Sequence, residues 1–220
     1  MQLIANSYLL ICIGFGLTHG IVQSVIRKKL PAYIHFILFS ILCTFLSRLV
    51  YVLAFMFYDG VPDRFNVGLL GFAASFFIIF LANFGKMDEL IGDRDRADPK
   101  FRVIAMAVPI LELVFSVLSL FLGQADFSVR IAFVIISVAA GFSGYLNVKH
   151  LLIPDVIGGV IRSLRGFNLT AFLIGLCTLA EIALTVYKSE RFVIWVQIVL
   201  GVLYAAAVPV LMRGVKKWTR

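Results

Sequence analysis

The sequence predicts an all-α integral membrane protein, a single domain of residues 1–220 that forms a bundle of seven transmembrane helices. Two observations predict this fold class. Hydrophobic residues make up 61% of the chain and charged residues 15%, whereas soluble domains have about half and about a quarter. The apolar residues also fall into runs of roughly 20 or more residues, the length that a helix needs to cross a bilayer.

Seven apolar runs have this length, and charged residues or Pro and Gly separate them. The linkers are short, so we expect one compact bundle without a soluble domain. Tyr58, Tyr187, Trp195 and Trp218 fall near expected helix ends, where aromatic side chains anchor a helix at the membrane interface. The predicted helices are residues 3–26, 32–58, 65–84, 103–123, 127–152, 167–187 and 192–212.

Lys and Arg gather on one side of the predicted bundle. Fifteen of them flank helices on that side, and only Arg64, Arg130, Lys188 and Arg191 flank helices on the other. The positive-inside rule makes the first side cytoplasmic, so we expect the N-terminus outside and the C-terminus in the cytoplasm. The net charge of +8 is then a topology signal, and we expect no nucleic-acid partner. We expect the protein to lie in the lipid bilayer of the plasma (inner) membrane.

The first predicted helix begins almost at Met1 but lacks a basic n-region and a small-residue cleavage site, so we expect a permanent span. Cys12, Cys43 and Cys177 lie within apolar runs and have no paired spacing. This pattern indicates packing residues, not a disulfide framework or a zinc site. We expect no bound metal and no cofactor.

Two segments on the cytoplasmic side are longer than the other linkers. Residues 86–102 contain five acidic and five basic residues, which predicts a solvated extension of the third helix that ends at Asp98-Pro99. A docking surface for a cytoplasmic partner is the alternative for this segment. Residues 150–166 predict an interfacial segment on the inner leaflet. The oligomeric state is left open.

Several chemistries lack residues that they require. A retinal protein needs a Schiff-base lysine in its last helix, and residues 192–212 contain none. His19, His35 and His150 are too few and too scattered for paired haem ligation or a histidine-rich zinc hydrolase. The sequence Gly141-Phe-Ser-Gly144 resembles the Gly-x-Ser-Gly of rhomboid proteases, but no histidine follows His150 to act as the base. There is no Pro-Gln dipeptide of the PQ-loop class. We therefore expect no enzyme and no catalytic residue.

Ionisable side chains inside the apolar runs are the candidate functional residues, because charges are costly in hydrocarbon and need a reason to be there. Arg48, Glu112 and Glu181 lie in the outer half or near the middle of their predicted helices. His19 lies nearer the cytoplasmic side and is a second candidate site. A satisfied core histidine is the alternative interpretation of His19.

Arg48, Glu112 and Glu181 each lie on a polar stripe with helical spacing, so we expect them to face protein or water. A guanidinium keeps its charge and its fork fits a carboxylate, which predicts that Arg48 pairs with one or both glutamates. One arginine and two glutamates leave an excess negative charge, which a bound proton or cation could balance. The predicted solute- or ion-binding residues are Arg48, Tyr51, Glu112, Ser116, Thr178, Glu181 and Gln197.

The same residues also allow a purely structural interpretation, because a buried ion pair can fix the register of two helices. Small residues four apart are typical of close helix contacts. The sequence has three such pairs, Gly16-x-x-x-Gly20, Gly71-x-x-x-Ser75 and Ser137-x-x-x-Gly141.

Two functional classes fit the pattern. A transporter or channel for a small solute or cation, with proton coupling as one option, explains the charges near the middle of the membrane. A seven-helix sensor or receptor that signals through a cytoplasmic partner explains the external N-terminus and the charged inner loops. A transporter needs a polar path that reaches both faces, whereas a receptor needs an outer pocket. We favour transport, because a sensor without an effector domain must find its signalling partner elsewhere.

Overall fold

A computed structural model of the protein describes residues 1–27, 30–58, 65–87, 99–152 and 160–218. Within these ranges the chain is helical, and seven helices are long and apolar enough to cross a membrane. This confirms the predicted all-helical fold and the number of candidate spans. The elements are α1 (Gln2–Ile26), α2 (Ala32–Tyr58), α3 (Val67–Leu81), the π-helix η1 (Ala82–Met87), α5 (Pro99–Leu122), α6 (Phe127–Leu152), α7 (Val160–Val186) and α8 (Glu190–Trp218).

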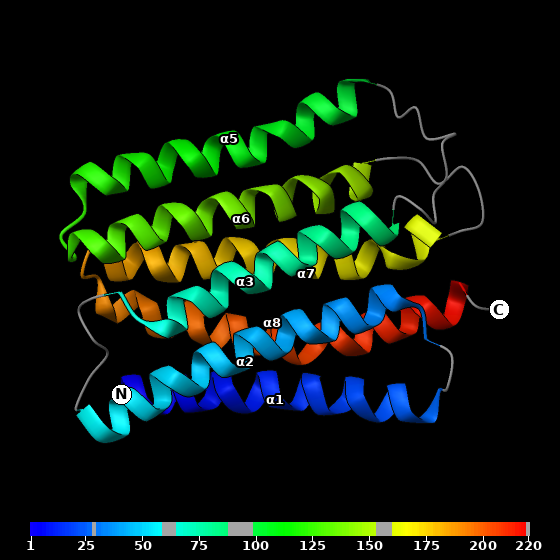
Figure 1. The fold of residues 1–220 in the computed structure, drawn as a ribbon, viewed down its shortest axis with the longest axis horizontal. Coiled ribbons are helices and arrows are strands. Elements are labelled where there is room, and N and C mark those ends of the chain that lie inside the picture. The colour runs from blue at the N-terminus through cyan, green and yellow to red at the C-terminus, as the bar shows by residue number, and fades with distance from the viewer. Residues whose placement is uncertain (28–29, 59–64, 88–98, 153–159, 219–220) are drawn as a thin grey trace.

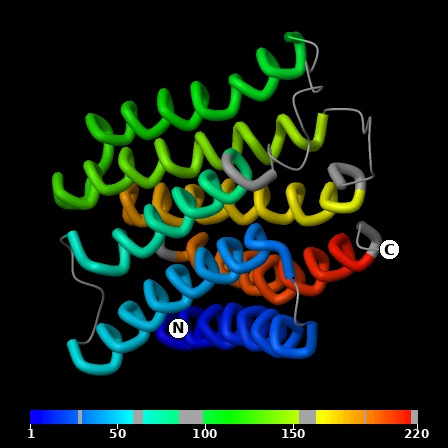
Figure 2. The backbone as a smooth tube through the Cα atoms, turned by 45° about the vertical axis from the view of Figure 1, so that its right-hand side comes forward, coloured from blue at the N-terminus to red at the C-terminus, as the bar shows by residue number. Residues whose placement is uncertain are grey.

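Six of the helices form a closed ring. Around it, α1 packs against α2, α2 against α3, α3 against α6, α6 against α7, α7 against α8, and α8 returns to α1. Helix α5 lies outside this six-helix ring and packs mainly along α6 (Figures 1 and 2). Its buried residues are Ala105, Ser116 and Ser119, and most of its large apolar side chains are exposed.

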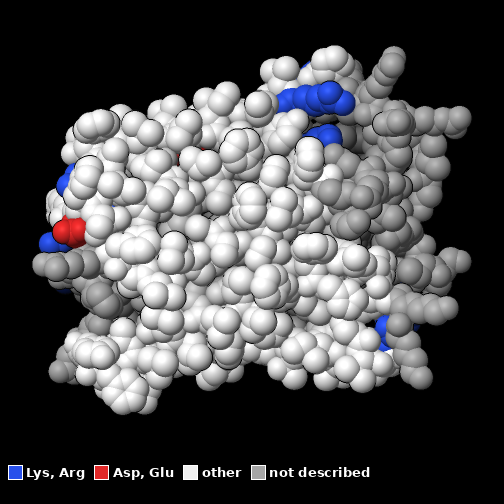
Figure 3. All heavy atoms as spheres, viewed as in Figure 1, with Lys and Arg blue, Asp and Glu red and all other residues white. Residues whose placement is uncertain are grey.

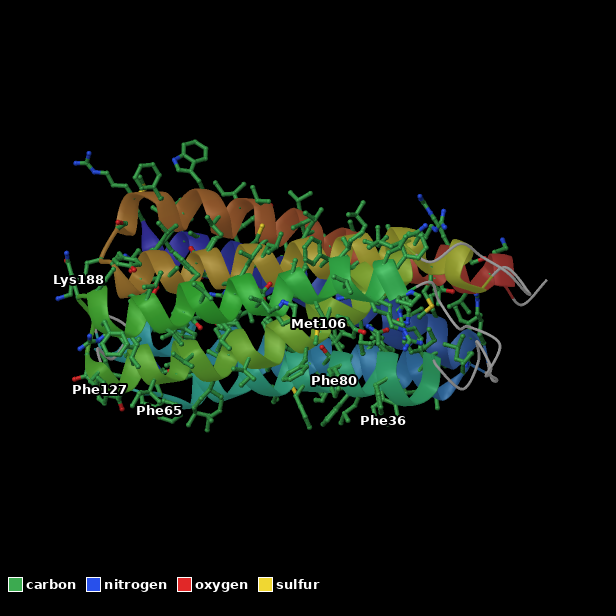
Figure 4. The ribbon with its side chains drawn as sticks, turned by 90° about the horizontal axis from the view of Figure 1, so that it is seen from above. Phe36, Phe65, Phe80, Met106, Phe127 and Lys188 are labelled. Carbon is green, nitrogen blue, oxygen red and sulfur yellow. The ribbon has the colours of Figure 1, made fainter. Side chains whose placement is uncertain are left out.

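Consecutive helices run in opposite directions, so the bundle has two ends (Figure 1). Figure 4 shows Phe65, Phe127 and Lys188 at one of them, where the amide of Phe65 donates to Ser128 Oγ at 3.0 Å. We call this the Lys188 end, and we call the opposite end, where α6 finishes, the His150 end. On the face drawn in Figure 3, Lys and Arg lie toward the two ends and the broad middle carries almost no charge.

The basic side chains of the described residues are divided unequally between the two ends. Arg130, Lys188 and Arg191 flank helices at the Lys188 end. More of them flank helices at the His150 end, namely Arg27, Lys100, Arg102, Lys149, Arg165, Arg213 and Lys216. The asymmetry agrees with the sequence pattern, and the cytoplasmic location of the His150 end stays a prediction.

Two helix starts differ from the predicted ones by four residues or more. Helix α5 begins at Pro99, four residues before the predicted start, whereas the end of the predicted extension of the third helix lies outside the described residues. Proline suits the first position of a helix, because its fixed φ is helical and its missing N–H has no partner there. Within the described residues the third helix continues as η1 to Met87. Residues 88–98, most of the segment predicted as a docking surface, lie outside the described residues.

Helix α7 begins at Val160, seven residues before the predicted start. The prediction of an interfacial segment is therefore wrong for residues 160–166, which form the first turns of a bundle helix. Leu164 in these turns is fully buried. Gly214 of α8 packs so closely on them that a methyl group added to its Cα would lie only 2.5 Å from the carbonyl oxygen of Ser163. Residues 153–159 lie outside the described part of the chain.

The three small-residue pairs lie at helix contacts, as predicted. A methyl group at Gly16 of α1 would lie 2.8 Å from the carbonyl oxygen of Tyr204 on α8. Likewise, a methyl group at Gly71 of α3 would lie 3.0 Å from the Cys43 carbonyl of α2, and one at Gly141 of α6 would lie 3.0 Å from Cα of Pro109 on α5. Only residues without a side chain allow the backbones to approach this closely.

Candidate functional site

An ion pair crosses the interior of the six-helix ring. Arg48 of α2 and Glu181 of α7 are 2% and 5% exposed. The Nη1 group of Arg48 donates to Oε1 of Glu181 at 2.7 Å, and Nη2 pairs with Oε2. The contact is bidentate, the geometry in which a guanidinium and a carboxylate match best. The structure thus brings together two of the three charged residues that the sequence singled out.

Aromatic rings cover the guanidinium of Arg48. Its Cζ lies 4.6 Å from the ring centroid of Phe72 on α3 and 5.9 Å from that of Tyr51, which follows one turn later on α2. A cation over an aromatic face is attracted by the ring's quadrupole, and the attraction grows when water is absent. Tyr51, a predicted site residue, therefore contacts Arg48, and Phe72 is a neighbour that the sequence interpretation missed.

Two amide side chains, Gln197 and Asn6, connect the ion pair to α8 and α1. Gln197 of α8 donates through Nε2 to Glu181 Oε1 at 2.7 Å and to Asn6 Oδ1 at 3.3 Å. Asn6 lies on α1 and is buried. We call Asn6, Arg48, Glu181 and Gln197 the Arg48 cluster. It joins α1, α2, α7 and α8 through side chains alone.

Hydroxyl groups continue from the Arg48 cluster toward the His150 end. Ser75 of α3 shares hydrogen bonds with Ser40 at 2.9 Å and with Thr44 at 2.8 Å, both on α2. The hydroxyl of Tyr204 on α8 donates to Thr44 Oγ1 at 3.5 Å. The polar stripe of α2 therefore faces the interior, as predicted. Thr178, another predicted site residue, is buried one turn before Glu181.

Glu112 does not join the Arg48 cluster, because α5 lies outside the ring. Its carboxylate faces α6, where a methyl group at Gly141 would lie 3.2 Å from Oε2 and one at Gly144 would lie 3.7 Å from Oε1. Glu112 Oε2 is buried and has no hydrogen-bond partner among the described residues. Ser116 is buried one turn further along and bonds the Leu113 carbonyl of its own helix. The excess negative charge expected beside Arg48 is therefore absent from the described cluster.

His19, the second candidate, also stands apart. It is half-buried on α1, and its ring stacks on that of Phe15 with the centroids 6.5 Å apart. Thirteen residues separate it from Asn6, which is roughly 20 Å along a helix. His19 and the Arg48 cluster are thus separate features.

A second buried polar group lies near the His150 end and was missed by the sequence interpretation. The hydroxyl of Tyr33 on α2 donates to Asn83 Oδ1 at 3.1 Å, and Asn83 Nδ2 donates to Asn147 Oδ1 of α6 at 2.9 Å. The signal was present, since an amide inside an apolar run is also costly in hydrocarbon.

An apolar layer separates the two polar groups. Phe76 of α3 is buried, and a methyl group at Gly175 of α7 would lie 3.7 Å from its Cε1 atom. Gly175 lies between Glu181 and Asn168 on α7, about 10 Å from each along the helix. Because α3 and α7 are not neighbours in the ring among the described residues, the Phe76 ring reaches across its interior.

Comparison of the chain with protein-family models, with curated proteins and with solved structures found no match. Its seven apolar helices of membrane-spanning length are consistent with a multi-pass membrane protein.

Proposed function

We propose that this protein is a membrane transporter for a small solute or cation and that the Arg48 cluster is its binding site. The observation that carries the proposal is a bidentate ion pair inside a closed ring of helices. A buried ion pair is not needed for stability, since well-packed apolar residues in its place are often as stable or more so. Charged groups at membrane depth commonly belong to substrate or ion pathways.

The ion pair offers a direct route for substrate exchange. Arg48 and Glu181 neutralise each other, so the resting cluster needs no counter-ion. A solute carboxylate could replace Glu181 on the guanidinium fork, and a cation could replace Arg48 on Glu181. A solute carboxylate in place of Glu181 would also meet the Nε2 group of Gln197, which donates to Glu181 in the structure. Such an exchange would release α2 from α7 and couple binding to a movement of the ring.

The interior of the ring has polar levels on both sides of an apolar level at Phe76. This arrangement supports a transport path that is closed at Phe76. Polar groups lie on both sides of Phe76, and an apolar constriction blocks ions and polar solutes because it stays dry. In a transport cycle the contact between Phe76 and Gly175 would open when the ion pair exchanges. The small residue at Gly175 leaves room for the ring to move along α7.

Glu112 supports proton or cation coupling at a separate place. Its carboxylate lies between α5 and α6 and has no cation partner among the described residues. A carboxylate in hydrocarbon needs a bound proton or a cation to offset its charge. We therefore assign the coupling role to Glu112 and the solute-binding role to the Arg48 cluster.

Flux measurements on purified protein in liposomes test the proposal. Under a proton or cation gradient, with a panel of charged and neutral solutes, the wild-type protein should show protein-dependent flux. The double variant Arg48→Met with Glu181→Met should remain folded, because it replaces both charges together. It should nevertheless lose flux. Thr185→Val, an exposed change one turn from Glu181, is the matched control and should keep flux.

A sensor is the second candidate, because an ion pair between α2 and α7 could equally lock one of two signalling states. Absence of flux under every gradient, together with a cytoplasmic protein that copurifies through residues 86–102, would favour the sensor. Full flux in the double methionine variant would instead mean that the Arg48 cluster only holds the helices together.

A further inference from the structure

The polar group near the His150 end is a chain of neutral side chains. The hydroxyl of Tyr33 donates to Asn83, and the amide of Asn83 donates to Asn147. All three residues are at most 1% exposed. Both hydrogen bonds join one helix to another, from α2 through η1 to α6. The chain therefore holds neighbouring parts of the six-helix ring together at this level.

These three residues lie close to helix ends. Tyr33 is the second residue of α2, Asn83 is the second residue of η1, and Asn147 lies in the last two turns of α6. Helix α7 reaches the same level, because its Phe167 ring meets the Tyr33 ring edge-on with the centroids 6.5 Å apart. Tyr33 thus contacts both η1 and α7, and it is linked to α6 through Asn83.

The chain differs from the Arg48 cluster in the cost of breaking it. Separating Arg48 from Glu181 leaves two buried charges without partners, which is strongly unfavourable. A hydrogen bond between neutral groups contributes much less in net terms, because water can replace the lost partner. Asn83 also lies in a π-helical turn, a departure from α-helix that is frequent at functional sites. A connection of this kind can open and close at low cost.

We propose that Tyr33, Asn83 and Asn147 form a latch that closes the interior of the ring at the His150 end. When its hydrogen bonds break, the three side chains bond to water, and water enters the ring as far as the Phe76 ring. We call these three residues the Tyr33 latch. Its part in a transport cycle rests on the function proposed above, whereas its opening can be measured without any flux.

Ala171 of α7 is a suitable position for a reporter of this opening. It lies one turn from Phe167 and one turn from Gly175, and residues four apart share one face of a helix. Phe167 contacts Tyr33, and Gly175 lies against Phe76, so this face runs from the latch to the apolar layer. Ala171 is 5% exposed. A cysteine at this position should therefore react slowly while the latch is closed.

Labelling of Ala171→Cys by a small charged methanethiosulfonate tests the latch, in purified protein whose native cysteines are replaced. Tyr33→Phe removes the hydroxyl but keeps the ring beside Phe167. We expect it to increase the labelling rate about 2- to 10-fold, the range that corresponds to the net loss of one hydrogen bond. Asn147→Ala breaks the other hydrogen bond and should increase the same rate. It decides the test if Tyr33→Phe fails to fold.

Two controls separate opening of the latch from a general loosening of the protein. Thr170→Val removes a hydroxyl that bonds the Gly166 carbonyl of its own helix, and it should leave the labelling rate of Ala171→Cys unchanged. Ala183 lies about 18 Å further along α7 and is 6% exposed. Labelling of Ala183→Cys should not respond to Tyr33→Phe.

An unchanged labelling rate of Ala171→Cys in both latch variants would overturn the proposal. An equal increase at Ala171→Cys and Ala183→Cys would do the same, because it would mean that the whole bundle loosens. Faster labelling at Ala171→Cys alone, in a protein that shows no flux, would support the latch and refute only its part in transport.

Discussion

Arg48 on α2 and Glu181 on α7 pair across the interior of the six-helix ring, although their helices do not pack side by side in the described structure. The link therefore depends on two side chains and not on a helix contact. Each charge is buried, so each needs the other. This dependence makes the pair open to direct tests.

Removing one partner should be costly. Glu181→Ala leaves a buried guanidinium without its carboxylate, and we expect a loss of about 3–5 kcal/mol in the free energy of unfolding. Adding Arg48→Leu should recover part of that loss. Unfolding of the protein in detergent micelles measures the free energies of both single variants and of the double variant. Simple additivity of the two changes would contradict the pairing.

Glu112 should behave differently from Glu181. Because Glu112 faces α6 from outside the ring, Glu112→Ala and Arg48→Leu should add to within about 0.5 kcal/mol, as expected for residues that share no partner. The same unfolding measurement serves both double-mutant comparisons, Arg48 with Glu181 and Arg48 with Glu112. A coupling energy above about 1 kcal/mol between these two positions would mean that the charges interact after all.

Phe76 and Phe77 are neighbours on α3 with opposite surroundings, the first buried and the second 53% exposed. Phe76→Ala should cost about 3–5 kcal/mol, because it leaves a cavity in the apolar layer. Phe77→Ala should cost much less and serves as the matched control. If Phe76 closes the path, the Phe76→Ala protein in liposomes should also leak small polar solutes. Equal leak in the two variants would remove Phe76 from the path.

Glu112→Gln tests the proposed coupling role. The amide keeps the shape of the side chain but cannot release a proton or hold a cation by charge. We expect solute flux that no longer responds to an imposed proton or cation gradient, while flux driven by the solute gradient itself remains. Liposome flux under each gradient separately measures this. Unchanged coupling in Glu112→Gln would move the coupling role elsewhere.

The orientation of the bundle is open to labelling. Gln124 lies between α5 and α6 at the Lys188 end, and Lys216 lies at the other end of the bundle on α8. In a background with Cys12, Cys43 and Cys177 replaced, an impermeant thiol reagent outside intact cells should label Gln124→Cys. It should not label Lys216→Cys until the membrane is permeabilised. The reverse result would invert the orientation inferred from the basic residues.

The sequence by itself determined the number and approximate positions of the helices, because an apolar run of membrane-spanning length is a local property of the chain. It also determined which face of α2 is buried, since Ser40, Thr44 and Arg48 share one side of any helix. The ends of the helices were less certain. Pro99 belongs to α5 because proline suits the first turn of a helix, and residues 160–166 belong to α7 because they pack against α8. The length of an apolar run reveals neither effect.

Only the tertiary structure decided which residues meet. Glu112 and Glu181 look equivalent in the sequence as partners of Arg48, and the choice follows from the position of α5 outside the ring. Asn83 and Asn147 likewise meet only because η1 and α6 are brought together. Periodicity along one helix gives the direction of a side chain, whereas its partner depends on how separate helices are arranged around a common interior.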